Sequence, residues 1–194
     1  MDKLSKKHII TITGKPGSGK STTSKAVAVE LGYRHFSSGD LFRSIGADRG
    51  ITVLQANLSG EKDSSIDYLV DQKLRDIGAN EDNMVIDSRT AWHWMPFAFK
   101  VCLDLDLMTA AERIMRDKDI SRLETEHIPD DPKEYALALQ QRLDSEARRY
   151  KKLYGVNPYD MSNYDLVVDT KASNPEQAAA LVLDGFRDWL NGLS

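Results

Sequence analysis

The chain has one cysteine, Cys102, among its 194 residues, so no disulfide can form within it. Cys102 lies in an apolar run, where a thiol is typically buried and unreactive. No apolar stretch approaches the roughly 20 residues that a membrane-spanning helix requires, and no Cys/His cluster has the spacing of a metal site. We therefore expect no disulfide, membrane span or zinc centre, and the cytoplasm is the default location.

Neither sign of charge dominates the composition. The 26 Lys and Arg residues stand against 30 Asp and Glu residues, which gives a net charge of −4. This charge provides no general attraction to nucleic acid or anionic membranes. The length is sufficient for one domain with a full core. We therefore expect a single domain, residues 1–194, that acts as a monomer on small molecules without a nucleic-acid or membrane partner.

Residues 14–21 match the phosphate-loop pattern G-x-x-x-x-G-K-[ST] at every fixed position. The β-branched run His8–Thr13 precedes the motif, and a helical pattern from Ser21 to Leu31 follows it. Glycines let backbone N–H groups surround an anion, and the helix points its positive end at the same place. Lys20 is expected to reach the β- and γ-phosphates, and the Ser21 hydroxyl to bind Mg²⁺. The residues of this loop predicted to bind a nucleoside triphosphate are Gly14, Lys15, Pro16, Gly17, Ser18, Gly19, Lys20, Ser21 and Thr22.

Strand patterns alternate with helical patterns along the rest of the chain. Further strands are expected at Tyr33–Phe36, Met84–Asp87, Phe99–Asp104 and Tyr164–Asp169. The helices between and after them are expected at Leu41–Gly50, Ile66–Gly78, Thr109–Lys118 (with Thr109 as the cap), Glu134–Leu153 and Pro175–Leu190. This alternation predicts a three-layer α/β fold with a five-stranded parallel sheet. Ligands of such sheets bind beyond the carboxyl ends of the strands.

Polar residues follow the predicted second and third strands. Asp87 ends an apolar strand, as the Mg²⁺-holding carboxylate of phosphate-loop enzymes does, although an Asp can also simply cap the next segment. Arg89 lies two residues further on, and Arg43 lies on the helix after the second strand. Both arginines could bind a phosphate group with two nitrogens.

Four more arginines lie on two predicted helices, namely Arg113, Arg116, Arg142 and Arg149. Taken singly, each could belong to a solvated helix face with weak ion pairs. Beside a phosphate loop they favour a transfer between two phosphate-bearing substrates, because such a cleft must neutralise several negative charges.

These motifs together resemble those of the nucleoside monophosphate kinases. The stretches Ser38-Gly39-Asp40-Leu41-Phe42-Arg43 and Asp87-Ser88-Arg89 carry that resemblance, and Arg142-x-x-x-Glu146-x-x-Arg149 resembles the cytidylate kinases, in particular their short archaeal type. The similarity runs from about Ile9 to Thr170. It implies ATP-dependent, Mg²⁺-dependent phosphorylation of CMP or dCMP to the diphosphate.

The resemblance also implies roles for particular residues. Ser38, Gly39 and Arg43 would bind the monophosphate, Glu146 would meet the ribose hydroxyls, and Arg113 would lie over the donor phosphates. The residues expected to neutralise the transferring phosphoryl group are Lys20, Arg89, Arg142, Arg149 and Arg116. Of these, Arg89, Arg142 and Arg149 would also hold the acceptor phosphate.

The same similarity divides the chain into a core (8–36, 81–115 and 134–194), a monophosphate-binding insert (about 37–80) and a lid (about 116–133). The acidic segment Glu124–Asp131 within the lid has no assigned role.

Two other functions remain open at this point. The acceptor could be UMP, AMP or a metabolite hydroxyl, with Asp40 or Asp87 as the base, although Arg43 and Arg89 favour a phosphate acceptor. Alternatively, the chain could be a nucleotide-binding regulator that turns over little ATP, although Lys20, Ser21 and Asp87 argue against it.

Two further groups of residues have a simpler interpretation. Asp67 and Asp71 share one face of a predicted helix and could read the amino group of cytosine. A solvated helix face is the favoured interpretation for both. Trp92 and Trp94 could stack on a base, but a hydrophobic segment that packs near the sheet edge is favoured.

Overall fold

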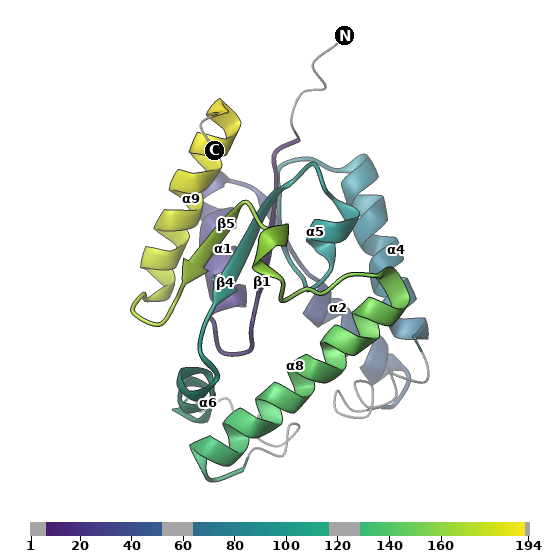
Figure 1. Cartoon of the computed structure of the whole chain (residues 1–194). Coiled ribbons are helices and arrows are strands. Elements are labelled where there is room, and N and C mark those ends of the chain that lie inside the picture. Colours follow the sequence, from purple (N-terminus) through teal and green to yellow (C-terminus); the bar gives the residue numbers. More distant parts are fainter. Residues whose placement is uncertain (1–6, 52–63, 117–128, 193–194) are drawn as a thin grey trace.

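The computed structural model describes residues 7–51, 64–116 and 129–192. Within these ranges, five parallel strands form one sheet in the order β2-β3-β1-β4-β5 (Figure 1). The strands are β1 (Ile9–Gly14), β2 (Arg34–Ser37), β3 (Met84–Asp87), β4 (Phe99–Asp104) and β5 (Leu166–Asp169). The predicted α/β fold with a five-stranded parallel sheet is therefore confirmed.

Helices cover both faces of this sheet. One face is covered by α1 (Lys20–Leu31) and α9 (Pro175–Asn191), and the other by α4 (Ser65–Asn80) and α5 (Ala91–Trp94), with α2 (Ser38–Asp48) packed on α4 (Figure 1). Two further helices, α6 (Leu107–Arg116) and α8 (Pro132–Tyr154), pack against each other. A short 3₁₀ helix, η1 (Met161–Asn163), precedes β5. In the described part of the chain, no helix combines the length and apolar character needed to cross a bilayer.

The central strand β1 is buried over its whole length, because both of its faces carry helices. Ile10 and Ile12 face the cluster formed with α1 and α9, whereas Ile9 belongs to the cluster formed with α4 and α5. This alternation is the two-residue period of a strand. Cys102 on β4 is buried as predicted, and burial raises the pKa of its thiol to about 12.

Strand boundaries differ from the predicted ones by one or two residues. The second strand begins at Arg34, because Gly32 closes α1 in a left-handed conformation (φ 66°) and the Tyr33 N–H still donates to the Ala28 carbonyl oxygen at 2.8 Å. The fifth strand begins at Leu166, because the Tyr164 N–H bonds back to the Met161 carbonyl oxygen at the end of η1.

Three predicted helix starts are wrong. Helix α2 begins at Ser38 rather than Leu41, because the Ser37 side chain caps it by accepting from the Asp40 N–H at 3.2 Å. Helix α6 begins at Leu107, and Thr109 is not its cap; instead the Asp106 carboxylate accepts from the Thr109 N–H at 2.9 Å and from its hydroxyl at 2.8 Å. Helix α8 begins at Pro132 because the Asp131 side chain caps it by accepting from the Lys133 N–H at 2.9 Å. Most of the predicted lid, including residues 117–128, and residues 52–63 of the predicted insert lie outside the described residues.

The contact between α6 and α8 gives a test of the fold with a matched control. Leu139 on α8 is 2% exposed and packs with Ala110 and Ile114 of α6, whereas Leu137 on the same helix is 66% exposed. Leu139→Ala should lower the free energy of unfolding by about 2–5 kcal/mol, because it leaves a cavity between the helices. Leu137→Ala should change it by less than about 1 kcal/mol. Urea unfolding measures both, and equal losses would contradict this packing.

Candidate active site

The phosphate loop joins the carboxyl end of β1 to the first residue of α1. Gly17 and Gly19 have φ angles of 74° and 79°, a conformation that side-chain-bearing residues rarely adopt. A Cβ at Gly17 would also lie 3.0 Å from the Ala110 carbonyl oxygen, so the loop packs directly on α6. Helix α1 begins at Lys20, immediately after this turn. The backbone N–H groups at the helix start therefore surround a place suited to an anion.

Lys20, Ser21 and Asp87 meet at the base of this loop. Asp87 pairs with Ile12 of β1 in the sheet register, which places its carboxylate beside the start of α1. The Ser21 hydroxyl donates to Asp87 Oδ2 at 2.6 Å, and Lys20 Nζ lies 3.4 Å from Asp87 Oδ1. Burial, together with repulsion from the Arg89 guanidinium, lowers the pKa of Lys20 to about 8. The adjacent oxygens of Ser21 and Asp87 are the type of ligand that Mg²⁺ prefers.

A cleft of about 520 Å³ opens beside this cluster. Besides the loop, its lining comes from α2, α4, the segment after β3, α6 and α8. The residues predicted from the sequence that line it are Lys15, Pro16, Gly17, Gly19, Lys20, Ser21, Thr22, Ser38, Gly39, Arg43, Asp87, Arg89, Arg113, Arg142, Glu146 and Arg149. Side chains from segments far apart in the sequence are thus brought together at the carboxyl edge of the sheet.

Three predicted residues are placed elsewhere. Gly14 is the last residue of β1, where a Cβ would lie 2.7 Å from the Leu103 carbonyl oxygen. Ser18 lines a neighbouring cavity of about 400 Å³, which the segment Thr170–Pro175 and Arg113 also border. Arg116 is exposed at the end of α6 and is not among the residues that line the cleft.

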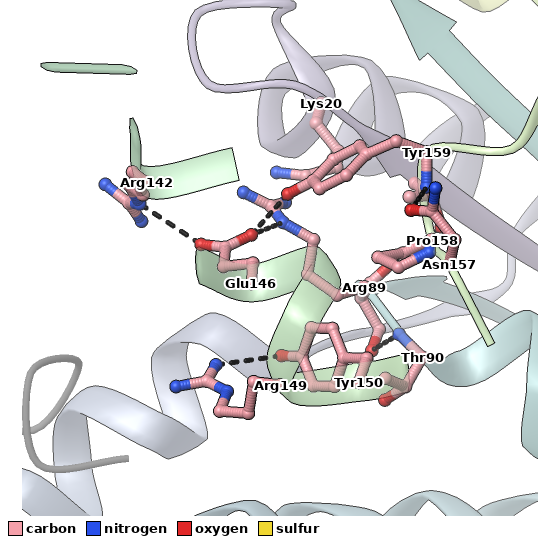
Figure 2. A network of polar contacts seen from close by, with 12 residues as sticks. Lys20, Arg89, Thr90, Arg142, Glu146, Arg149, Tyr150, Asn157, Pro158 and Tyr159 are labelled. Carbon is pink, nitrogen blue, oxygen red and sulfur yellow. Dashed lines mark hydrogen bonds and ion pairs between the residues drawn. The ribbon is translucent and has the colours of Figure 1, made fainter. Parts of the chain in front are cut away.

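Glu146 is the centre of a polar network on the α8 side of the cleft (Figure 2). Its carboxylate accepts from Arg89 Nε at 3.0 Å and from Arg142 Nε at 3.1 Å, and it also accepts from the Tyr159 hydroxyl. Burial alone would raise the pKa of Glu146, but Arg89 and Arg142 hold it well below its usual range. Glu146 therefore fixes two of the arginines predicted to bind phosphate. Its predicted contact with ribose stays a prediction.

Arg149 lies one turn further along α8 and is 8% exposed. Its Nη2 atom donates to the Tyr150 hydroxyl at 3.2 Å and lies 3.6 Å from Asp67 Oδ1 on α4. Its Nε atom is buried and has no hydrogen-bond partner among the described residues. A buried donor without a partner is costly, so a ligand oxygen in the cleft would satisfy it.

Asp67 and Asp71 do not lie on a solvated helix face, so that interpretation is wrong. They are 7% and 3% exposed and both line the cleft. Asp71 accepts from Thr90 Oγ1 at 3.2 Å, from Trp94 Nε1 at 2.9 Å and from the Tyr154 hydroxyl. Their four-residue spacing was visible in the sequence, but the residues that cover them, among them Arg149 and Tyr154 of α8, were not.

Sequence reasoning also missed Tyr159. It lies in the loop after α8, where the Asn157 side-chain oxygen accepts from its N–H at 3.0 Å, and its hydroxyl reaches Glu146 (Figure 2). No local pattern marks a single loop tyrosine as part of a site. Only the return of the chain toward β5 brings it to α8.

Arg113 borders both the cleft and the neighbouring cavity, and its predicted position over the donor phosphates stays a prediction. It donates to the carbonyl oxygens of Thr170 at 2.7 Å and Lys171 at 3.0 Å, and so ties α6 to the segment after β5. This segment borders the neighbouring cavity, which opens beside the phosphate loop.

A parallel sheet with a phosphate loop at its carboxyl edge and an arginine-rich cleft defines the class of P-loop kinases. A gluconokinase from Sinorhizobium meliloti shares the fold, with a TM-score of 0.63 at 16% identity over 97% of this chain and 96% of that chain. The profile of the cytidylate kinase-like family matches residues 9–172. The chain belongs to the cytidylate kinase-like family.

Individual relatives agree with this assignment. The chain is 40% identical to a cytidylate kinase from Natronomonas pharaonis, over 90% of this chain and 86% of the relative. It is 38% identical to a cytidylate kinase from Haloarcula marismortui, over 93% of this chain and 90% of the relative.

The Glu146 network leads to a prediction about stability and pH. Glu146→Gln should lower the free energy of unfolding at pH 7 by about 3 kcal/mol, because it leaves two arginines without their buried counter-charge. Since the folded-state pKa of Glu146 lies below its ordinary value of 4.5, this contribution is fully present above pH 4.5 and is lost as the pH falls further. Asp144→Asn, an exposed change on the same helix, should have little effect. Urea titrations at pH 7 and pH 3 measure both, and a pH-independent loss would contradict the assignment.

Proposed function

We propose that this protein transfers the terminal phosphoryl group of ATP to CMP or dCMP, giving ADP and the cytidine diphosphate. The observation that carries the proposal is one cleft in which a phosphate loop faces Arg89, Arg142 and Arg149. Membership of the cytidylate kinase-like family and the names of the two relatives support the same reaction. They do not favour a hydroxyl acceptor or a regulator without turnover.

The residues divide into a donor group and an acceptor group. The loop and Lys20 bind the ATP phosphates, and the cavity beside the loop accommodates the rest of the donor nucleotide. On the acceptor side, Ser38, Gly39 and Arg43 of α2 hold the monophosphate with Arg89. The start of α2 adds its positive end, since the Ser37 side chain caps only the Asp40 N–H at 3.2 Å.

The transfer requires alignment and charge neutralisation rather than a general base. An oxygen of the acceptor phosphate is already anionic, so it can attack the terminal phosphorus while the bond to the ADP oxygen breaks. Lys20, Arg89, Arg142 and Arg149 neutralise the charge that spreads over the transferring group. Ser21 and Asp87 fit Mg²⁺, because their oxygens are adjacent at the base of the loop; the ion supplies further charge neutralisation when bound.

The predicted lid, residues 116–133, would close over the donor phosphates and exclude water. Arg116 at the edge of that segment stays a predicted contributor from the closed lid. We also propose that the enzyme acts as a monomer on free nucleotides in the cytoplasm.

The first test is ADP formation from ATP and Mg²⁺ with CMP, dCMP, UMP, AMP, GMP or no acceptor. We expect strong turnover with CMP or dCMP and little without an acceptor. Lys20→Ala should abolish this turnover, because the transferring group then loses its nearest positive charge. Absence of turnover with every monophosphate, or undiminished turnover in Lys20→Ala, would refute the proposal.

A second prediction separates acceptor binding from donor binding. Arg43 lines the cleft from α2, outside the phosphate loop, and pairs only with Asp40 on its own helix among the described residues. Arg43→Ala should raise the KM for CMP about 10- to 100-fold and leave the KM for ATP within about twofold, as expected for loss of one charge-assisted contact.

The matched control is Arg148→Ala, an exposed arginine on α8 that does not line the cleft, and it should change neither KM. A larger effect of Arg43→Ala on ATP than on CMP would place Arg43 on the donor side instead.

A further inference from the structure

Asp67 and its neighbour Asp71 differ in the number of hydrogen bonds that their carboxylates accept from other side chains. The Asp71 carboxylate accepts hydrogen bonds from three side chains and therefore has a structural role in the wall of the cleft. Within the described ranges, the contact recorded for the Asp67 carboxylate is the ion pair with Arg149, at 3.6 Å. This distance is too long for a hydrogen bond. Asp67 is 7% exposed, yet it lines the cleft and retains its capacity to accept.

The chemistry around Asp67 indicates which part of a ligand it would meet. A carboxylate repels phosphate, and the phosphate-binding groups of the cleft are Lys20, Arg89 and the arginines of α8. Asp67 lies on α4 at the edge of this group, 3.6 Å from Arg149 and one turn before Val70, which also lines the cleft. Phe42 of α2 lines it too and packs against the apolar cluster that contains Val70. A cleft lined by two apolar side chains and a buried acceptor suits a planar base that carries a hydrogen-bond donor.

We propose that Asp67 accepts a hydrogen bond from the exocyclic amino group of cytosine and thereby sets the preference for CMP over UMP. Cytosine presents an N4 amino donor where uracil presents a carbonyl oxygen. A carboxylate favours the first and repels the second, so one residue provides both attraction and rejection. This inference rests on the proposed function, since it names how the acceptor site of that reaction recognises its base.

The ionisation of Asp67 provides a measurement that needs no variant. Burial raises the pKa of Asp67 to about 6, with Asp71 of α4 and Glu146 of α8 raising it further and Arg149 of α8 opposing them. Arg43 of α2 also lines the cleft. Protonation turns Asp67 into a donor, which suits uracil rather than cytosine. The CMP/UMP ratio of kcat/KM should therefore fall severalfold between pH 7.5 and pH 5.5, while ionisation of the shared phosphate cancels in the ratio.

The decisive variant is Asp67→Asn, which keeps the shape of the side chain and adds an amide donor. We expect the CMP/UMP ratio of kcat/KM to fall about tenfold or more, as for the loss of one base-specific contact, and to become independent of pH. Asp76→Asn is the matched control, because Asp76 is an exposed carboxylate on the same helix outside the cleft. It should leave the ratio at the wild-type value.

Calorimetric dissociation constants for CMP, UMP and dCMP, measured on the same proteins without ATP, separate the two hypotheses. If the wild type binds CMP more tightly than UMP but forms no ADP, the proposed reaction fails while base recognition is still tested. If Asp67→Asn weakens CMP and UMP equally, Asp67 only positions Arg149, and the inference is overturned. A change in the CMP/dCMP ratio with an unchanged CMP/UMP ratio would assign Asp67 to the ribose and also overturn it.

Discussion

The arginines that line the cleft repel one another, and the buried carboxylate of Glu146 offsets this repulsion by accepting hydrogen bonds from two of them. Arg89 and Arg142 come from different parts of the chain, and both reach Glu146 through their Nε atoms. This contact does not use the two-nitrogen end of the guanidinium group, which binds phosphate bidentately. Removing a buried counter-charge of this kind costs far more than a surface ion pair contributes. The arginines are therefore held in place before a substrate arrives.

The parallel sheet explains why these groups meet at all. Strands that run in one direction end at one edge, so the loop after β1, the start of α2 after β2 and Asp87 at the end of β3 become neighbours. The α6–α8 pair then adds arginines from beyond that edge. The residues that line the cleft are thus brought together by the same parallel topology that buries β1.

Polarity varies within the cleft in a way that matches two different parts of a nucleotide. Lys20 and the arginines surround the place where phosphates would meet, whereas Asp67, Val70 and Phe42 line the wall formed by α2 and α4. The two buried aspartates have different roles despite their equal chemistry. Asp71 is bonded to Thr90, Trp94 and Tyr154, and so links α4, the segment after β3 and the end of α8. Asp67 lines the cleft, and its recorded contact among the described residues is the ion pair with Arg149.

The sequence by itself determined the fold class, the phosphate loop and the position of Asp87 at the end of a strand. These features depend on local patterns: β-branched runs, glycine positions and the period of apolar residues. Helix starts were less certain, since Asp106 and Thr109 are both good caps and only the folded chain selects one. Burial of Asp67 and Asp71 and the contact of Tyr159 with Glu146 were decided by tertiary structure alone. Whether a helix face meets water or another helix depends on residues distant in the sequence, and no local pattern records them.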